Sequence, residues 1–132
     1  MIGRCCDYHL YHRDYSVAVA AFGNNKMRLY WTDKLLEEGY EVPAIVHPSA
    51  VVSPSVTLEP GCFIMQRSVV NTNTKIERAA LVNSGAVVDH NSVVCAGAHV
   101  GLGSVVKANC TIESGRKVEA GEVIFSTRRK IE

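Results

Sequence analysis

The feature that most constrains this chain is a run of aliphatic residues spaced by six. From residue 46 to residue 124 every sixth residue is Val, Ile or Leu, and all but one are β-branched: Val46, Val52, Leu58, Ile64, Val70, Ile76, Val82, Val88, Val94, Val100, Val106, Ile112, Val118 and Ile124. A helical period cannot produce a strict spacing of six, and simple strand alternation would make the intervening even positions aliphatic too. The pattern predicts a left-handed parallel β-helix built from six-residue repeats.

Two other positions of the repeat fit a triangular prism. The residue four places after each aliphatic one is mostly small, which lets the chain turn a corner. The residue three places after it sorts into ladders with a spacing of eighteen: Arg67, Gly85, Gly103, Gly121; Gly61, Ala79, Gly97, Gly115; and Ser55, Asn73, Asn91, Asn109. Gly and Asn best tolerate the positive φ that a sharp corner often needs. Three repeats make one coil, so residues eighteen apart should stack at ~4.8 Å, and stacked Asn side chains are expected to hydrogen-bond along their ladder.

The first 45 residues lack the repeat and predict a strand–helix–strand unit. Residues 16–22 form an apolar segment, and residues 42–46 predict a second strand that leads into the repeats. The helix between them is marked by a turn and cap at Gly23, Asn24 and Asn25, by Met27, Tyr30, Trp31 and Leu35 at helical spacing, and by Gly39 at its end. We therefore divide the chain into a partial α/β unit, residues 1–45, and the β-helix, residues 46–132. The first unit is too small to be stable alone, so we expect it to pack on the β-helix or on other chains.

Composition argues against several classes of protein. The formal net charge is +1, which suggests neither a nucleic-acid nor a membrane-surface partner. No apolar run reaches the ~20 residues that span a bilayer, and the N-terminal residues lack the apolar centre of a signal peptide. The five cysteines are odd in number and show no CxxC spacing, which favours neither disulfides nor a zinc site. We expect a cytoplasmic protein without a bound metal.

Four segments of the sequence carry a specific resemblance: GNN at 23–25, HPSA at 47–50, NSGAVVDH at 83–90 and GAHVGLGSVVKA at 97–108. With them, most of the chain resembles the sialic acid O-acetyltransferase and bacillosamine (UDP-4-amino-sugar) N-acetyltransferase family. Members of that family are trimers with an N-terminal sugar-nucleotide domain and a C-terminal hexapeptide β-helix. The resemblance implies a homotrimer that transfers acetyl from acetyl-CoA to an amino or hydroxyl group of a sugar or nucleotide sugar, and it makes residues 1–45 a partial sugar-nucleotide-binding unit.

The resemblance also implies roles for individual residues. His90 falls on the family's general-base histidine, and an imidazole has a suitable pKa for that task near neutrality. His99 falls on a histidine that lies against acetyl-CoA, and Ala120 falls near a position that contacts CoA. The turn of Gly23, Asn24 and Asn25 lies where the family's N-terminal domain meets the sugar.

The sequence departs from the family pattern beside the base. Asn91 stands where the family usually has a carboxylate that raises the basicity of the histidine. Asp89 is the alternative modulating residue, although neighbours in a strand point to opposite faces. Relative to the family, the sequence starts about halfway through the N-terminal domain, lacks its glycine-rich loop and ends about two coils early.

Spacing around the prism predicts how the histidines are used. His90 and His99 are nine residues apart, or half a coil, so they should lie on different faces and meet groups across an interface between prisms. Aliphatic residues beside the inward positions would leave apolar faces that a trimer buries: Val51, Val69, Leu81, Val87 and Val105. His47 is expected to be structural. The basic residues 128–130 are expected to form a solvated tail, with a contact to CoA phosphates as the alternative.

Two other functions stay open on the sequence alone. One is a non-catalytic trimeric β-helix scaffold or sugar-nucleotide-binding relic, which the replacement of the carboxylate by Asn91 would favour. The other is a metal hydrolyase of the γ-carbonic-anhydrase type, which binds zinc through three histidines, two of them five apart. The sequence has no HxxxxH spacing, so it disfavours this reading.

Overall fold

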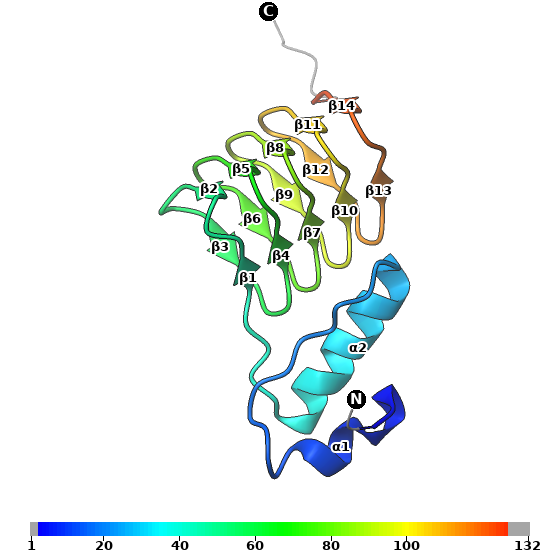
Figure 1. The fold of residues 1–132 in the computed structure, drawn as a ribbon. Coiled ribbons are helices and arrows are strands. Elements are labelled where there is room, and N and C mark those ends of the chain that lie inside the picture. The colour runs from blue at the N-terminus through cyan, green and yellow to red at the C-terminus, as the bar shows by residue number, and fades with distance from the viewer. Residues whose placement is uncertain (1–2, 127–132) are drawn as a thin grey trace, which may run out of the picture.

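The computed structural model describes residues 3–126, and the six-residue pattern forms a β-helix in it (Figure 1). Two-residue strands stack into three parallel sheets. Sheet 1 contains β1 (Ile45–Val46), β4 (Phe63–Ile64), β7 (Leu81–Val82), β10 (His99–Val100) and β13 (Lys117–Val118). Sheet 2 contains β2 (Val51–Val52), β5 (Val69–Val70), β8 (Val87–Val88), β11 (Val105–Val106) and β14 (Val123–Ile124). Sheet 3 contains β3 (Thr57–Leu58), β6 (Lys75–Ile76), β9 (Val93–Val94) and β12 (Thr111–Ile112).

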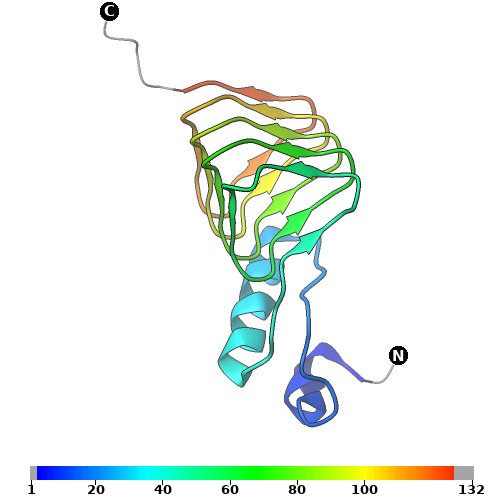
Figure 2. The same ribbon diagram turned by 90° about the vertical axis from the view of Figure 1, so that its left-hand side faces the viewer.

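The strand register confirms the spacing of eighteen. His99 pairs with Leu81 on one side and with Lys117 on the other, and every other paired strand keeps the same offset. The coils therefore stack in register, and Figure 2 shows their three-sided outline. Each residue of a coil lies directly beside its counterpart in the next one.

The predicted core is confirmed. Every aliphatic position of the repeat from Ile64 to Val118 is at most 1% exposed, because its side chain points into the prism. The small residues four places later are buried as well: Cys62, Ser68, Thr74, Ala80, Ala86, Ser92, Ala98, Ser104 and Cys110. Burial weakens only at the two ends of the prism, where Val46 is 41% exposed.

The corners also follow the prediction, with one correction. Positive φ recurs every six residues from Gly61 to Gly121, including the non-glycine corners Arg67 and Ala79. Each corner amide donates to the coil before it, as the Asn91 amide does to the Thr72 carbonyl and the Asn109 amide to the His90 carbonyl. The expected side-chain bonds along the Asn ladder are absent among residues 3–126, because backbone groups make these connections instead.

The N-terminal region has the predicted helix, but of the two predicted strands only the end of the second forms one, as β1. Helix α2 (Asn25–Glu38) begins at Asn24, whose side chain accepts a hydrogen bond from the Met27 amide at 3.0 Å, and it ends at Gly39 in the left-handed conformation. Residues 16–22 and 42–44 are extended without forming a sheet. One parallel bridge joins Val17 to Glu41, just before the second segment, and neither segment has a further neighbouring strand among the described residues.

Helix α2 packs along one corner of the prism, as the sequence led us to expect for this unit. The corner is the ladder from Gly61 to Gly115, between sheets 3 and 1 (Figure 1). A Cβ on Gly97 would lie 3.1 Å from the Leu29 Cβ, and one on Gly61 would lie 2.8 Å from the Thr32 methyl group. Gly61 and Gly97 therefore serve both the positive φ and the close approach of the helix, whereas Gly115 serves only the positive φ.

The buried face of α2 is not the apolar one suggested by its sequence. Met27 and Tyr30 are 43% and 52% exposed, whereas Arg28, Thr32 and Leu35 are buried. A short 3₁₀ turn, η1 (Cys5–Asp7), and helix α1 (Tyr8–Tyr11) lie beside the far end of α2, where Tyr8 packs edge-on against Trp31. All five cysteines are free thiols, and no helix within residues 3–126 is long and apolar enough to cross a bilayer.

Candidate functional site

His90 lies on the corner between sheets 2 and 3, directly after β8. Its side chain is exposed, and its carbonyl accepts the Asn109 amide of the next coil at 3.1 Å. The Asn91 side chain reaches the imidazole, with 3.1 Å between Asn91 Nδ2 and His90 Nδ1. The sequence did not reveal this amide–histidine contact.

The Asn91 contact determines where a neutral His90 carries its proton. An amide NH₂ only donates, so in this orientation Nδ1 accepts and the proton lies on Nε2. A general base needs the opposite arrangement, in which Asn91 Oδ1 accepts from Nδ1–H and Nε2 is free. The Asn91 side chain makes no other hydrogen bond among residues 3–126, so rotating its amide by 180° breaks nothing else. The geometry is compatible with a base once the amide rotates.

Asp89 supports the backbone at His90 but does not contact the ring. Its Oδ1 accepts from Asn71 Nδ2 at 2.9 Å and from the His90 amide at 2.8 Å. These hydrogen bonds, that of Asn71 first, lower the pKa of the Asp89 carboxyl below its usual value. The contacts favour a role for Asp89 in fixing the turn that presents His90.

His99 lies on the outer face of sheet 1, in β10, beside the start of α2. It lines an open cavity of about 520 Å³ together with Gly23, Asn24, Asn25, Lys26, Gly115 and Lys117. The structure thus brings the sequence-predicted residues His99, Gly23, Asn24 and Asn25 to one place. Two lysines in this cavity suit a ligand that carries phosphate groups.

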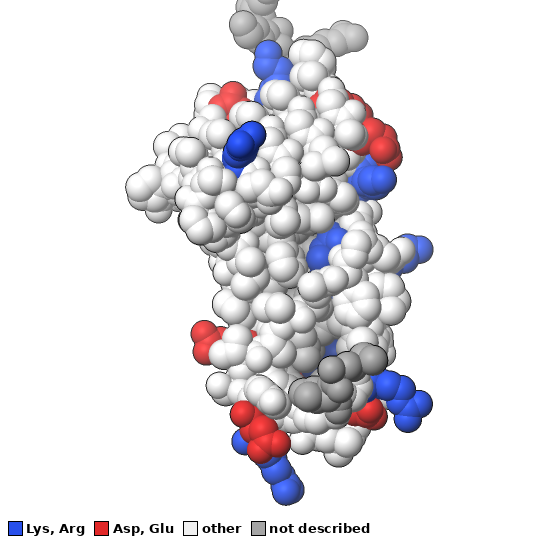
Figure 3. Space-filling view, viewed as in Figure 1, with Lys and Arg blue, Asp and Glu red and all other residues white. Residues whose placement is uncertain are grey.

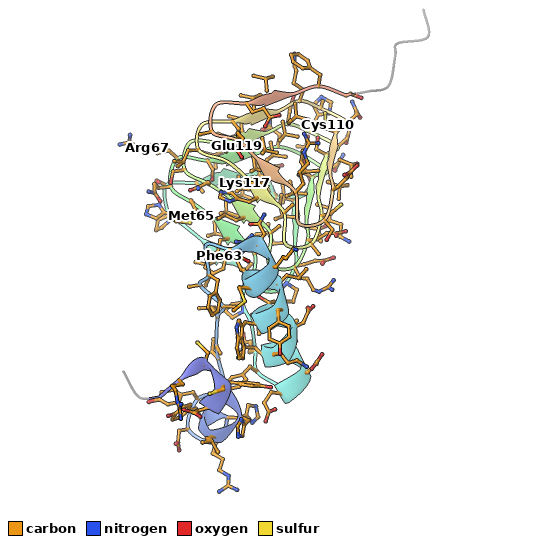
Figure 4. All side chains as sticks on the ribbon, turned by 90° about the vertical axis from the view of Figure 1, so that its right-hand side faces the viewer. Phe63, Met65, Arg67, Cys110, Lys117 and Glu119 are labelled. Carbon is orange, nitrogen blue, oxygen red and sulfur yellow. The ribbon has the colours of Figure 1, made fainter. Side chains whose placement is uncertain are left out.

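A second, apolar cavity of about 250 Å³ adjoins the first at Gly23. It is lined by Ala21, Phe22, Gly23, Arg28, Phe63, Met65, Leu81 and Asn83. Figure 4 shows Phe63 and Met65 on the prism beside the first turn of α2, and Lys117 farther along. Along sheet 1, the outward side chains therefore change from apolar in the early coils to polar and basic in the later ones.

Arg28 holds α2 and the Gly23 turn on the prism. Its side chain is 1% exposed, and its Nε donates to the Ala79 carbonyl at 2.7 Å. The terminal nitrogens donate to oxygens of Phe22, Gly23, Asn25, Gly97 and Ala98. None of these partners is a carboxylate, and burial lowers the pKa of the guanidinium. The sequence analysis missed Arg28, although an arginine three residues after Asn25 in a core-facing helix was a usable signal.

One chain does not bring all of the predicted site residues together. His90 lies on the edge between sheets 2 and 3, His99 on the outside of sheet 1, and Ala120 is exposed next to the corner between sheets 1 and 2. This confirms that the two histidines face different directions. His47 bonds Ser49 at 2.8 Å, as expected for a structural residue. Residues 128–130 lie outside the described residues.

Sheet 2 presents a continuous apolar outer ladder. Its outward residues are all valines: Val51, Val69, Val87, Val105 and Val123. Val51 is 64% exposed and Val123 44%. Figure 3 shows a mostly uncharged surface at the upper left, where β2, β5 and β8 lie in Figure 1, interrupted by basic side-chain atoms. Leu81, which the sequence analysis grouped with these valines, lies on sheet 1 instead.

Within residues 3–126, no group of three or more His, Cys, Asp or Glu side chains is arranged to hold a metal ion. Acidic side chains do gather on sheet 3, but they form an ion-pair network in which the Lys75 ammonium lies 2.7 Å from Glu59 and 3.3 Å from Glu77. The carboxylates of this network also accept backbone amides of the next coil, at Arg78 and Ala96. These contacts indicate a structural role.

No protein-family model matches the sequence, but solved structures do. PerB from Caulobacter crescentus, in complex with CoA and GDP-perosamine, superposes with a TM-score of 0.77 and 29% identity over 91% of this chain and 67% of that one. A histidine-to-alanine mutant of GDP-perosamine N-acetyltransferase from the same organism, with the same ligands, gives 0.78 and 29%, over 91% and 66%. The acetyltransferase domain of PglB from Neisseria gonorrhoeae gives 0.74 and 26%, over 92% and 70%.

The chain spans about two thirds of the length of these structures. The PglB domain has also been solved with acetyl coenzyme A. The superpositions cover more than nine tenths of this chain. The superpositions confirm the fold and the resemblance inferred from the sequence: this chain is similar to the hexapeptide-repeat sugar acetyltransferases.

Proposed function

We propose that this protein is a homotrimeric acyltransferase that moves an acetyl group from acetyl-CoA to an amino group of a sugar or nucleotide sugar. The observation that carries the proposal is the superposition on structures that hold CoA together with GDP-perosamine. An amino acceptor is favoured over a hydroxyl because N-acetylation is the activity named for the Caulobacter relative.

In this proposal His90 is the general base. Acetyl-CoA supplies the acetyl group as a thioester, and His90 Nε2 takes the proton of the acceptor amine as its nitrogen attacks the carbonyl carbon. The imidazolium then returns that proton to the departing sulfur. Asn91, with its amide rotated, would hold Nδ1–H and so keep Nε2 directed at the acceptor.

The second part of the site would come from a neighbouring subunit. His99, the turn at Gly23, Asn24 and Asn25, and the lysines beside them lie on another side of the prism from His90. Packing the valine ladder of sheet 2 between prisms removes its apolar surface from water and sets edges of adjacent prisms side by side. We assign acetyl-CoA to the side of His99 and Ala120, and the sugar to the Gly23 turn.

Calorimetric titration with acetyl-CoA, followed by turnover assays on a panel of amino sugars and their nucleotide derivatives, tests the function. We expect acetyl-CoA binding and acetylation of at least one nucleotide-linked amino sugar. Light scattering tests the assembly, with a trimer expected at micromolar concentration. A protein that binds no acetyl-CoA would refute the proposal.

The second candidate is a non-catalytic trimeric scaffold or sugar-nucleotide-binding relic. The specific observation in its favour is the Asn91 amide, which places the proton of neutral His90 on Nε2 and supplies no negative charge to the ring. Binding of a nucleotide sugar without any acetyl transfer would select this candidate.

A further inference from the structure

The side chain of Asn83 is held in one orientation beside His99. Asn83 Oδ1 accepts the Ser84 backbone amide at 2.8 Å, and Asn83 Nδ2 lies 3.0 Å from His99 Nε2. A backbone amide only donates, so the oxygen of Asn83 must face Ser84 and its NH₂ group must face the imidazole. His99 Nε2 must therefore be the acceptor, and a neutral His99 carries its proton on Nδ1.

The charges around His99 keep it neutral. Burial lowers the pKa of His99 below its usual value, and the Arg28 guanidinium and Lys117 lower it further, while Glu119 opposes them. Lys26 adds a third basic group to the cavity lining. An imidazolium would also carry a hydrogen on Nε2, directed at the NH₂ group of Asn83. Both the charges and the hydrogen-bond geometry exclude the protonated ring near neutral pH.

We propose that Asn83 is a positioning residue that locks His99 in the Nδ1–H form, so that His99 donates a hydrogen bond to an oxygen of the bound ligand and cannot act as a base. Nδ1 has no protein partner among residues 3–126, and the ring lines the cavity beside α2. Naming the ligand rests on the proposed function, in which a carbonyl or phosphate oxygen of acetyl-CoA is the acceptor. The tautomer itself does not depend on that function.

Long-range ¹H–¹⁵N correlation spectra of the full chain with ¹⁵N-labelled histidine test the tautomer directly. At pH 7.5 we expect His99 to show a protonated Nδ1 and an unprotonated Nε2, the reverse of the form that free histidine prefers. The five histidines are assigned by single replacement, with His99→Gln identifying the relevant signals. A wild-type spectrum with His99 protonated on Nε2 would overturn the proposal without any variant having to fold.

Replacing Asn83 tests the lock. Asn83→Asp keeps the bond to the Ser84 amide but places a carboxylate oxygen against Nε2, so the proton should move to Nε2 and the pKa of His99 should rise. Asn83→Ala should leave a mixture of both tautomers. The control is Asn73→Asp, which adds the same charge at an exposed corner away from sheet 1. If Asn83→Asp folds and leaves the His99 signals unchanged, Asn83 is not the positioning residue.

Titration with acetyl-CoA separates this inference from the proposed function. We expect acetyl-CoA to shift the Nδ1 signal of His99 in the wild type, as a new hydrogen bond forms. Binding that leaves this signal unmoved would overturn the donor role of His99. Absence of any acetyl-CoA binding would contradict the proposed function, while the tautomer would still be read from the free protein.

Discussion

The two histidines of the candidate site are held by the same kind of group and yet differ in chemistry. Each has one ring nitrogen within about 3 Å of an asparagine NH₂ group, from Asn91 at His90 and from Asn83 at His99. The Asn83 amide is pinned by the Ser84 backbone, whereas the Asn91 amide is free to rotate. An asparagine beside a histidine does not by itself fix which ring nitrogen carries the proton. A second hydrogen bond, from the Ser84 amide to Asn83, fixes it at His99, whereas Asn91 has no such bond among the described residues and leaves it open at His90.

The surroundings of the two rings reinforce that difference. His90 is exposed to solvent at a corner of the prism. His99 is half-buried beside the cation of Arg28, which has no carboxylate partner among the described residues. The ring proposed as the general base therefore stands on the open edge, and the ring proposed as a hydrogen-bond donor stands against buried positive charge.

The largest expected effect is loss of the fold, which removes both histidine sites because both lie on the same β-helix. Val88→Asp places an unpaired charge in the interior, where Val88 is 0% exposed. The cost should exceed ~3 kcal/mol, a large share of the ~5–15 kcal/mol by which domains are usually stable. We expect loss of soluble folded protein by circular dichroism and size-exclusion chromatography.

The matched control for Val88→Asp is Val87→Asp, one residue earlier on the outer ladder of sheet 2. It should keep the β-helix and disrupt only the trimer, as measured by light scattering. A folded Val88→Asp variant would mean that the inward register is wrong by at least one residue.

The next largest effect separates the histidines by role. His90→Ala should reduce turnover by ~10²–10⁴-fold, the usual range for a lost general base, with little change in acetyl-CoA affinity. His99→Ala should weaken acetyl-CoA binding more than it slows turnover at saturation. Steady-state kinetics and calorimetry measure both, and full activity in His90→Ala would remove the mechanism proposed for this site.

A smaller effect is expected from replacing Asn91, which tests how the residue beside His90 affects its basicity. Asn91→Asp puts a carboxylate where the amide now meets Nδ1, so the imidazolium formed on proton transfer is stabilised and Nε2 is freed. We expect a faster rate or a pH–rate profile moved upward. Asn91→Glu supplies the same charge but fits the left-handed backbone less well, since φ is 55° there.

The control for Asn91→Asp is Asn109→Asp. Asn109 occupies the same corner one coil on, also with positive φ, and within residues 3–126 its side chain makes no hydrogen bond to a histidine ring, although its backbone amide donates to the His90 carbonyl. An equal gain in both variants would point to a general charge effect. An inactive wild type that gains activity in Asn91→Asp would identify a site one substitution from function.

The smallest expected effect is a pH dependence of stability from His99. The folded protein holds the pKa of His99 below the ordinary value of 6.5, so below about that pH the unfolded chain takes up a proton that the folded chain does not. Stability should therefore be unaffected by His99 well above that value and fall as the pH drops from about 6.5 to 5.5. Denaturant midpoints measure it, and His99→Gln should flatten the dependence over this window. The lowered pKa of Asp89 adds a loss only near and below pH 4, as the pH falls toward its folded-state pKa.

The β-helix could be predicted almost completely from the sequence, because each repeat uses the same three positions for the same physical tasks. Register, core and positive-φ corners all follow from a spacing of six. The strand predicted over residues 16–22 failed because strand formation depends on a neighbouring strand, and only Glu41 is available. The burial of Arg28 on helix α2 could not be predicted from the sequence, because it depends on the corner carbonyls of Ala79 and Gly97, which accept its hydrogen bonds.

Parts of the candidate site could not be predicted from sequence patterns. The positions of His90 and His99 on different faces followed from their separation along the coil. The partners that set their chemistry did not: Asn83 and His99 are 16 residues apart and Arg28 and Gly97 are 69 apart. Such pairs are fixed by how helix α2 and successive coils stack, and no local motif records them.

Helix α2 also has a consequence for how the molecule comes apart. In a solenoid each repeat contacts only its neighbours, so coils can fray one at a time from an end. Helix α2 contacts this corner in successive coils, with Thr32 at Gly61, Arg28 at Ala79, Leu29 at Gly97 and Asn25 at Gly115. Because these coils all pack against one helix, we expect them to unfold cooperatively. The last coil, beyond Gly115, should exchange its amide hydrogens independently of them.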